Sequence, residues 1–119
     1  MRVLVVSDDP SVRDEAVFGF PLGFEVIFAM DSREASSHFQ EELPAVVVVD
    51  MQTGNAGGYA LMREMAETET LARIPTLILL QRKQDAWLAT RAGATAYRTK
   101  PLGPGQLARE VVALTTTRP

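Results

Sequence analysis

The sequence predicts an α/β fold in which five strands alternate with five helices, a doubly wound (βα)5 sandwich of three layers around a five-stranded parallel sheet. Five short apolar runs of strand length recur along the chain, at residues 3–6, 24–28, 45–49, 76–80 and 94–97. Segments with helical spacing separate them, and each right-handed crossover of this kind returns the chain beside the preceding strand. At 119 residues, with 46% hydrophobic and 23% charged residues, the chain has the size and composition of one globular domain. We therefore expect a single domain over residues 1–119, with no output domain.

Three of the five runs should be central strands. The runs at residues 3–6, 45–49 and 76–80 are continuously hydrophobic, and β-branched residues are prominent in them. A parallel strand that is covered on both faces has this pattern, because neither set of side chains meets water.

The first two helices have recognisable starts. Asp9 can cap a helix that has Pro10 at its first position, and Asp31 followed by Glu34 is an acidic variant of the capping box. In the first helix the residues expected on the buried face are Val12, Ala16, Val17 and Phe20. In the second they are Ala35, Phe39 and Leu43.

The three later helices are less sharply bounded. One should run from Gly58 to just before Ile74, and a second should cover residues 84–92 with Gly93 as its left-handed end. The last should cover 104 to about 115, with Leu107, Val111 and Leu114 facing inward.

Composition excludes several classes of function. Twelve Lys and Arg against fifteen Asp and Glu leave a net charge of −3, so no electrostatic footprint for DNA, RNA or an anionic membrane stands out. The absence of cysteine excludes disulfides and thiolate chemistry, and His38 is the single histidine, which removes most zinc and Ser-His-Asp arrangements. The apolar run at residues 3–6 is too short for a signal peptide or a membrane span. We expect a cytoplasmic protein that is not an enzyme.

Charged residues follow three of the predicted strands. Ser7, Asp8 and Asp9 follow the first strand, Asp50 ends the third, and Lys100 follows the fifth. Ligand sites of doubly wound sheets lie beyond the carboxyl ends of the strands, so these residues should converge. Asp8 and Asp50 are candidate Mg²⁺ ligands, and a carboxylate beside Mg²⁺ can attack a phosphoryl donor while Lys100 pairs with it. Asp9 is expected to serve only as a helix cap.

The chain resembles the receiver domain of two-component response regulators, the CheY-like members of the flavodoxin-like folds. The residues that carry the resemblance are the segments RVLVVSDDP at 2–10, GFEV at 23–26 and VVVDM at 47–51, Gly58, Ile74-Pro75 and AGATAYRTKPL at 92–102. The resemblance covers nearly the whole chain and implies a sheet of strand order 2-1-3-4-5.

The resemblance also implies roles for individual residues. Asp50 corresponds to the phospho-acceptor, and the Mg²⁺ ligands would be Asp8, Asp50 and the backbone carbonyl of Gln52. Lys100 corresponds to the lysine of the family's site, with a cis peptide bond to the proline that follows. Tyr97 corresponds to the aromatic residue that changes rotamer on activation, although a half-buried strand aromatic would have the same pattern.

Three residues depart from the family pattern. Ser7 replaces one of two acidic residues, so cation affinity should fall. Leu80 replaces the Ser or Thr that contacts the phosphoryl group, and a hydrogen bond to a charged group is worth about 1.5 to 3 kcal/mol. Gln81 stands where a small residue usually leaves the site open, in a loop that is about two residues shorter than usual. We therefore expect weaker coupling between phosphorylation and loop movement, with the acceptor itself retained.

The family's usual contact face is made of the fourth helix, the fifth strand and the fifth helix. Trp87 lies early in the fourth predicted helix, and its bulk favours packing against the sheet over a role as partner anchor. The implied partners are a sensor histidine kinase or phosphotransfer protein and a downstream protein. The same face is a candidate for homodimerisation.

Two functions stay open from the sequence. One is a stand-alone receiver that is phosphorylated on Asp50 with Mg²⁺, and the other is a pseudo-receiver that binds partners without phosphorylation. A dehalogenase-like phosphatase would need a second Asp two positions after a nucleophile that ends the first strand, which the sequence lacks. A flavodoxin-like cofactor protein would need a phosphate loop where Asp9 is anionic.

Overall fold

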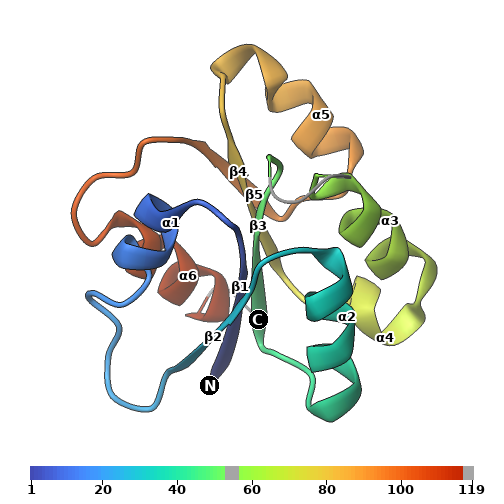
Figure 1. Cartoon of the computed structure of the whole chain (residues 1–119), viewed down its shortest axis with the longest axis horizontal. Helices are drawn as coiled ribbons and strands as arrows, with labels where there is room; N and C mark the ends of the chain where they lie inside the picture. The colour runs from blue at the N-terminus through green and yellow to red at the C-terminus, as the bar shows by residue number, and fades with distance from the viewer. Residues whose placement is uncertain (53–56, 117–119) are drawn as a thin grey trace.

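The computed structural model describes residues 1–52 and 57–116. Five parallel strands form one sheet in the order β2-β1-β3-β4-β5, which confirms the predicted fold and strand order. The strands are β1 (Arg2–Val6), β2 (Glu25–Ala29), β3 (Val46–Asp50), β4 (Thr76–Leu80) and β5 (Ala96–Thr99). Helices α1 (Pro10–Glu15) and α6 (Gln106–Thr116) cover one face of the sheet. The other face carries α2 (Ser32–Glu41), α3 (Tyr59–Glu67), α4 (Glu69–Ala72) and α5 (Ala86–Arg91), as Figure 1 shows.

The three central strands contribute side chains to two separate hydrophobic clusters, one on each face of the sheet. Alternate side chains of β1, β3 and β4 point to opposite faces, as the pleat requires. Leu4, Val47 and Ile78 pack with the helices α2, α3, α4 and α5, whereas Val5, Val48 and Leu77 pack with α1 and α6. Burial on both faces explains why these three segments are continuously apolar, and it confirms that they are central.

The first helix ends earlier than its apolar spacing predicts. Asp9 caps α1 as expected, because its side chain accepts a hydrogen bond from the amide of Ser11. Helical bonding stops after Ala16, and the chain turns away at Gly19 with φ +84°. The prediction that Val17 faces the core is therefore wrong, and its side chain is 64% exposed. Phe20 does pack against the hydrophobic cluster on the α1 and α6 side of the sheet, but it does so from the loop that follows α1.

The second helix has the predicted start and a different end. Asp31 accepts a hydrogen bond from the amide of Glu34, while the Glu34 carboxylate accepts from the amide of Met30 rather than of Asp31. The helix ends at Glu41, and Glu42 is extended with φ −161° and ψ 131°. Leu43 consequently lies beyond the helical face and is exposed, which corrects its predicted place in the core.

The region from 58 to 74 forms two helices instead of one. Thr68 is extended with φ −114° and ψ 116°, and it separates α3 from α4. The fourth predicted helix is also shorter than expected, because a 3₁₀ turn (Lys83–Asp85) precedes α5. Gly93 ends this region with φ +91°, as predicted. β5 begins at Ala96, two residues later than the apolar run suggested.

Gly58 lets α3 start directly against the sheet. A Cβ atom at this position would lie 2.4 Å from Cγ1 of Val49 and 3.2 Å from the Asp50 carbonyl oxygen. A side chain there would push α3 away from the end of β3, so the glycine helps to set the path of the chain around Asp50. Within residues 1–52 and 57–116, the helices are too short or too polar to cross a membrane.

Candidate functional site

The carboxyl ends of β1, β3 and β5 bring Ser7, Asp50 and Lys100 together. Asp50 is the last residue of β3, Ser7 directly follows β1, and Lys100 directly follows β5. Val6 of β1 pairs with Val49 of β3, so Ser7 and Asp50 lie at the same level of the sheet. The predicted convergence of Asp50 and Lys100 is present in the structure.

Asp50 is enclosed and hydrogen-bonded at both carboxylate oxygens. The residue is only 1% exposed. Its Oδ2 accepts hydrogen bonds from Lys100 Nζ at 2.9 Å and from Ser7 Oγ at 2.8 Å. Its Oδ1 accepts one from the Gln52 amide at 3.1 Å. A buried carboxylate is stable as an anion only with such partners, so this geometry holds the side chain in one orientation.

Lys100 bridges two carboxylates, and one of them is Asp9. The Nζ atom lies 3.1 Å from Asp9 Oδ2, while Asp9 Oδ1 accepts from the amide and hydroxyl of Ser11. Asp9 is therefore more than the helix cap that the sequence predicts, because one oxygen caps α1 and the other pairs with Lys100. A free second oxygen is the signal that could have suggested this, since a capping interaction uses only one.

These contacts shift two pKa values. The hydrogen bond from the Ser11 hydroxyl, followed by that from Lys100, lowers the pKa of Asp9 below its ordinary value. Burial of the Lys100 ammonium on its own would lower its pKa, but the hydrogen bonds to Asp50 and Asp9 outweigh burial, and the pKa of Lys100 is raised. Asp9 and Lys100 are therefore both charged over the whole neutral range. The Lys100 ammonium contacts two carboxyl groups, those of Asp9 and Asp50.

Ser7 has a contact that the sequence did not suggest. It is fully buried, its hydroxyl donates to Asp50, and the same oxygen accepts a hydrogen bond from the amide of Asp9 at 3.0 Å. The sequence treats Ser7 only as a missing carboxylate. In the fold it is a hydrogen-bond donor that competes with any other group for Asp50 Oδ2.

The residues predicted to hold Mg²⁺ offer oxygen donors, the kind of ligand that this ion prefers. Asp8 is exposed one residue after Ser7, and Gln52 is exposed two residues after Asp50. Among the described residues, no group of three or more His, Cys, Asp or Glu side chains is placed to share a metal ion. Mg²⁺ is commonly held by one or two carboxylates with several waters, so two carboxylates and a carbonyl oxygen suit a weak site.

The position predicted to lack a hydroxyl is filled by an apolar side chain. Leu80 is buried in the cluster beneath α3 and α5, and its carbonyl oxygen accepts a hydrogen bond from the Lys100 amide at 2.8 Å. Gln81 is exposed at the start of the turn that leads to α5. Tyr97 is 40% exposed on β5, and the Lys100–Pro101 peptide bond is cis, as expected.

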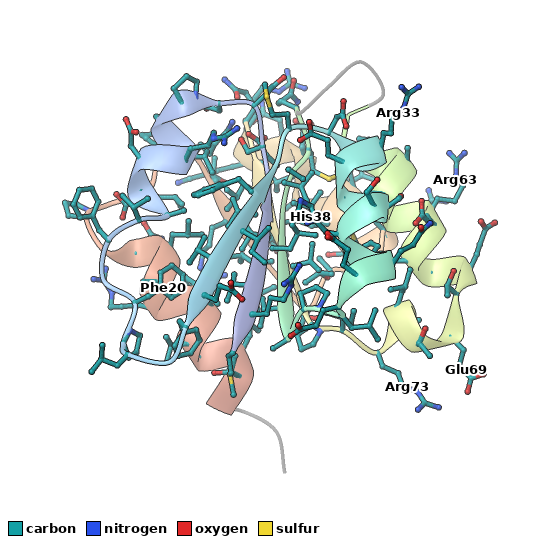
Figure 2. All side chains as sticks on the ribbon, turned by 60° about the horizontal axis from the view of Figure 1, so that its bottom comes forward. Phe20, Arg33, His38, Arg63, Glu69 and Arg73 are labelled. Atoms are coloured by element: carbon teal, nitrogen blue, oxygen red, sulfur yellow. The ribbon has the colours of Figure 1, made fainter. Side chains whose placement is uncertain are left out.

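Trp87 does not pack against the sheet. Its side chain is 57% exposed on α5, so the interpretation as a buried helix aromatic is wrong. The buried residue of this helix is Ala89, and a side chain two positions earlier lies on a different side of the helix. His38 lies on α2, on the other side of the sheet from Phe20 (Figure 2).

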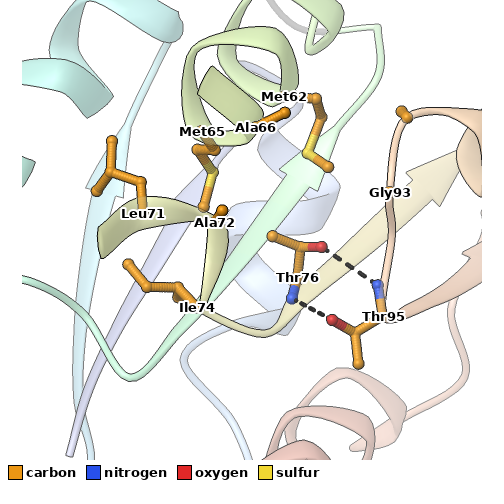
Figure 3. Close-up of a pocket in the computed structure, with 10 residues that line it drawn as sticks. Met62, Met65, Ala66, Leu71, Ala72, Ile74, Thr76, Gly93 and Thr95 are labelled. Atoms are coloured by element: carbon orange, nitrogen blue, oxygen red, sulfur yellow. Dashed lines mark hydrogen bonds between the residues drawn. The ribbon is translucent and has the colours of Figure 1, made fainter. Parts of the chain in front are cut away.

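Hollows in the protein surface are alternative candidate sites to the charged cluster around Asp50. One of about 220 Å³ lies at the amino-terminal ends of β4 and β5, where Thr76 and Thr95 exchange two hydrogen bonds (Figure 3). Its lining is apolar apart from these two threonines. Another of similar volume lies beside Lys100, and Ser11 and Glu15 also line it. The charged cluster around Asp50 therefore remains the candidate site.

The comparisons with known proteins agree with this geometry. A family model for the response regulator receiver domain matches residues 3–112. The chain belongs to this family. It is 38% identical over 117 residues to an uncharacterized 14.6 kDa protein from Leptolyngbya boryana, covering 93% of this chain and 87% of that protein. It is 35% identical over 116 residues to the gliding motility regulatory protein of Myxococcus xanthus, covering 95% of this chain and 14% of that protein.

Solved structures show the same fold. A putative response regulator from Chloroflexus aurantiacus superimposes with a TM-score of 0.84 at 25% identity, covering 96% of each chain. Receiver domains are signalling modules of two-component systems and not conventional enzymes. The chain spans less than half of several curated relatives, including response regulator Rre1 of Synechocystis, of which it covers 48%.

Proposed function

We propose that this receiver accepts a phosphoryl group on Asp50 with Mg²⁺ and signals through protein contact. The observation that carries the proposal is the pairing of Asp50 with Lys100 at 2.9 Å, where three parallel strands end. The Lys100 ammonium holds the buried Asp50 carboxylate in one position before a phosphoryl donor binds. The donor would be a sensor histidine kinase or a phosphotransfer protein.

The proposed transfer uses an oxygen of the Asp50 carboxylate as nucleophile. This oxygen forms a bond to phosphorus, and the bond from phosphorus to the donor's leaving group breaks with its electron pair going to that group. The product is an acyl phosphate on Asp50. Lys100 stays protonated throughout, and its ammonium pairs with the anionic oxygens of the product.

Asp8, Asp50 and the Gln52 carbonyl would hold the cation. When bound, Mg²⁺ neutralises charge on the phosphoryl oxygens. A receiver domain of a sensor histidine kinase from Pseudomonas aeruginosa carries a magnesium ion in its active-site cleft, at 21% identity to this chain. Asp8 is exposed here, which allows a cation to approach from solvent.

The contact face would be the surface of α5, β5 and α6. Trp87 and Tyr97 are both exposed there, and Trp is enriched at binding hot spots. Residues before position 80 include five Lys and Arg against thirteen Asp and Glu, whereas those from 80 onward include seven against two. A downstream partner with an acidic surface suits this face. Homodimerisation through the same face stays a prediction.

A pseudo-receiver that binds partners without phosphorylation is the second candidate. Both oxygens of Asp50 already accept hydrogen bonds, and the residue is 1% exposed. Leu80 has no hydroxyl that could donate a hydrogen bond to a phosphoryl group on Asp50. On this alternative the contact face would have one fixed state.

Intact mass after incubation with a small phosphodonor and Mg²⁺ separates the two candidates. We expect a gain of one phosphoryl group, its loss on chelation of Mg²⁺, and no gain in Asp50→Asn. Asp14→Asn, an exposed Asp on α1, is the matched control and should be phosphorylated like the wild type. A chain that gains no phosphoryl group while still binding a histidine kinase would reject phosphorylation and favour the pseudo-receiver.

A further inference from the structure

The hydrogen bonds around the Asp50 carboxylate close into a ring that passes through Asp9. From Asp50 Oδ2 one path leads to the Ser7 hydroxyl, which accepts a hydrogen bond from the Asp9 amide at 3.0 Å. The other path leads to Lys100 Nζ, which lies 3.1 Å from Asp9 Oδ2. Asp9 is therefore connected to Asp50 twice, once through its backbone and once through its side chain.

The Asp9 side chain is held in place by contacts on its other oxygen. Its Oδ1 accepts hydrogen bonds from the Ser11 amide at 2.9 Å and from the Ser11 hydroxyl at 2.8 Å. Pro10 follows directly, and its ring fixes the φ angle at the start of α1. The oxygen that faces Lys100 is consequently fixed by the turn that carries it.

The Lys100 ammonium needs a partner besides Asp50 to stay where it is. Its side chain is only 12% exposed. An ammonium has three N–H donors, and a donor that loses its partner in so enclosed a place costs free energy. Without the Asp9 carboxylate the ammonium would gain by tilting toward water, and its contact with Asp50 Oδ2 would loosen.

Ser7 does not provide the charge that Asp9 provides. The Ser7 hydroxyl and Lys100 Nζ contact the same oxygen of Asp50, so the two groups lie close to each other. The hydroxyl is neutral, however, and it donates to Asp50. A carboxylate at position 7 would lie beside the ammonium, and in its absence the second negative charge at Lys100 comes from Asp9.

We propose that Asp9 is a positioning residue for the phosphorylation of Asp50, because it holds the Lys100 ammonium on Oδ2 and leaves Oδ1 as the oxygen that attacks phosphorus. A carboxylate oxygen has two lone pairs, and Oδ2 already accepts two hydrogen bonds, from Ser7 and Lys100. Oδ1 accepts one, from the Gln52 amide. This inference rests on the proposed function and adds which oxygen reacts and which residue selects it.

Phosphoryl transfer then takes place at Asp50 Oδ1. This oxygen forms a bond to phosphorus while the bond from phosphorus to the donor's leaving group breaks, and the electron pair of that bond goes to the leaving group. No proton moves to or from Asp50. When the donor arrives, the Lys100 ammonium lies on Oδ2 and keeps the carboxylate from rotating. Because Asp9 acts through Lys100, it should affect the rate at saturating donor more than the donor concentration that is needed.

The rate of phosphorylation by acetyl phosphate with Mg²⁺ tests this role. Asp9→Asn keeps the oxygen that caps α1 and replaces the oxygen that faces Lys100 by an amide nitrogen, which accepts no hydrogen bond. We expect the rate at saturating donor to fall by about ten- to a hundredfold, while the half-saturating donor concentration stays close to that of the wild type. Asp14→Asn, the matched control on α1, should react like the wild type.

A restored acidic side chain separates positioning from helix capping. Ser7→Asp places a carboxylate beside the Lys100 ammonium, so in the Asp9→Asn background it should recover most of the lost rate. Asp9→Ser keeps a capping oxygen but has no atom that reaches Lys100, and it should be as slow as Asp9→Asn. If Asp9 were only the cap of α1, Asp9→Ser would react normally and Ser7→Asp would recover nothing.

The two lysines of the chain give a measurement that does not depend on phosphorylation. Lys83 is exposed in the 3₁₀ turn, whereas Lys100 is enclosed. With lysine labelled by nitrogen-15, the Lys100 ammonium of the wild type should give a signal at neutral pH, because its hydrogen bonds slow exchange with water, and the Lys83 ammonium should not. Asp9→Asn should weaken or abolish the Lys100 signal, and Ser7→Asp should restore it.

Three results would overturn the proposal: a Lys100 signal that is unchanged in Asp9→Asn, a rate that is unchanged in Asp9→Asn, or a lost rate that Ser7→Asp does not recover. A wild type that gains no phosphoryl group would instead reject the proposed function. The Lys100 signal alone would then decide whether Asp9 holds the ammonium on Asp50.

Discussion

Single side chains decide how the Asp50 carboxylate is held. Asp50 Oδ2 accepts from both Lys100 and Ser7, and Lys100 reaches Asp9 as well. Because Asp50 is almost fully buried, the anion has little water to replace a partner that is removed. The energetic role of Lys100 is therefore to prevent an uncompensated buried charge more than to add attraction.

Lys100→Met should destabilise the protein by about 3 to 5 kcal/mol, since it leaves Asp50 buried and charged with its ammonium partner removed. In an Asp50→Asn background the same substitution should cost much less, because the buried group is then neutral. Urea unfolding of the four proteins in a double-mutant cycle measures the difference. Equal costs in both backgrounds would show that the pair contributes nothing to folding.

Asp9→Asn should make the free energy of unfolding depend less on pH in the acid range. The pKa of Asp9 is lowered from 3.8 in the folded chain, so its charged form adds stability above about pH 4, and this is lost as the pH falls through the folded pKa. Unfolding free energies measured between pH 5 and about pH 2 should therefore fall less in the variant. Asp14→Asn, on the exposed side of α1, is the control and should follow the wild type.

Individual elements depart from the family where switching would be expected. The end of β4 carries Leu80, which packs into the cluster beneath α3 and α5. A 3₁₀ turn precedes α5, which is short, and Tyr97 stands on the exposed side of β5. Among the described residues, the hydrogen bonds of the Asp50 carboxylate come from Ser7, Gln52 and Lys100, and none comes from a side chain of the proposed contact face.

Leu80→Thr should supply a polar link between Asp50 and the end of β4. A hydroxyl at the end of β4 can donate to a phosphoryl oxygen on Asp50, and one such bond is worth about 1.5 to 3 kcal/mol, or roughly ten- to a hundredfold in a switching equilibrium. Amide spectra with and without a beryllofluoride mimic should show larger shifts around Tyr97 and Trp87 in the variant.

Ile78→Thr is the matched control for this substitution. Ile78 is equally buried on the same face of β4 as Leu80, but it pairs with Val49 and lies two residues further from the carboxyl end of the strand, so its hydroxyl would not reach Asp50. It should lose similar stability and gain no response. A full response in the wild type would show that the missing hydroxyl is unimportant, and no response in either protein would favour the pseudo-receiver.

The whole molecule is one sheet with a hydrophobic cluster on each face, so a ligand at its carboxyl edge should stabilise the domain as a unit. Each central strand contributes side chains to both clusters. Binding to the folded state alone raises stability in proportion to the logarithm of ligand concentration over Kd. Melting temperature is consequently a direct reading of cation affinity.

Mg²⁺ should raise the melting temperature weakly, with an effect of about 4 °C or more only when its concentration exceeds Kd about tenfold. Asp50→Asn should reduce this rise. Ser7→Asp should melt lower than the wild type without Mg²⁺, because two buried carboxylates repel, and should gain more from the cation. Tight binding that persists in Asp50→Asn would contradict the proposed ligands.

Sequence patterns alone predicted the fold and the proximity of Asp50 and Lys100. Continuous apolar runs identify β1, β3 and β4 because strands buried on both faces have no polar positions. Asp50 and Lys100 are identified because parallel strands end at one edge, which makes strand-end residues neighbours whatever their separation in the chain. These features follow from local pattern and topology alone.

Tertiary structure decided the features that depend on which atoms meet. From the sequence, Ser7 is only a missing carboxylate, but in the fold its hydroxyl donates a hydrogen bond to Asp50. Asp9 is predicted only as a helix cap, but in the fold it also accepts a hydrogen bond from Lys100, which is 91 residues away in the chain. Val17 and Trp87 have core-like side chains and are nevertheless exposed, because helix ends and helix orientation determine which faces the sheet covers. Periodicity describes one element at a time, whereas burial and hydrogen bonding are properties of pairs of elements.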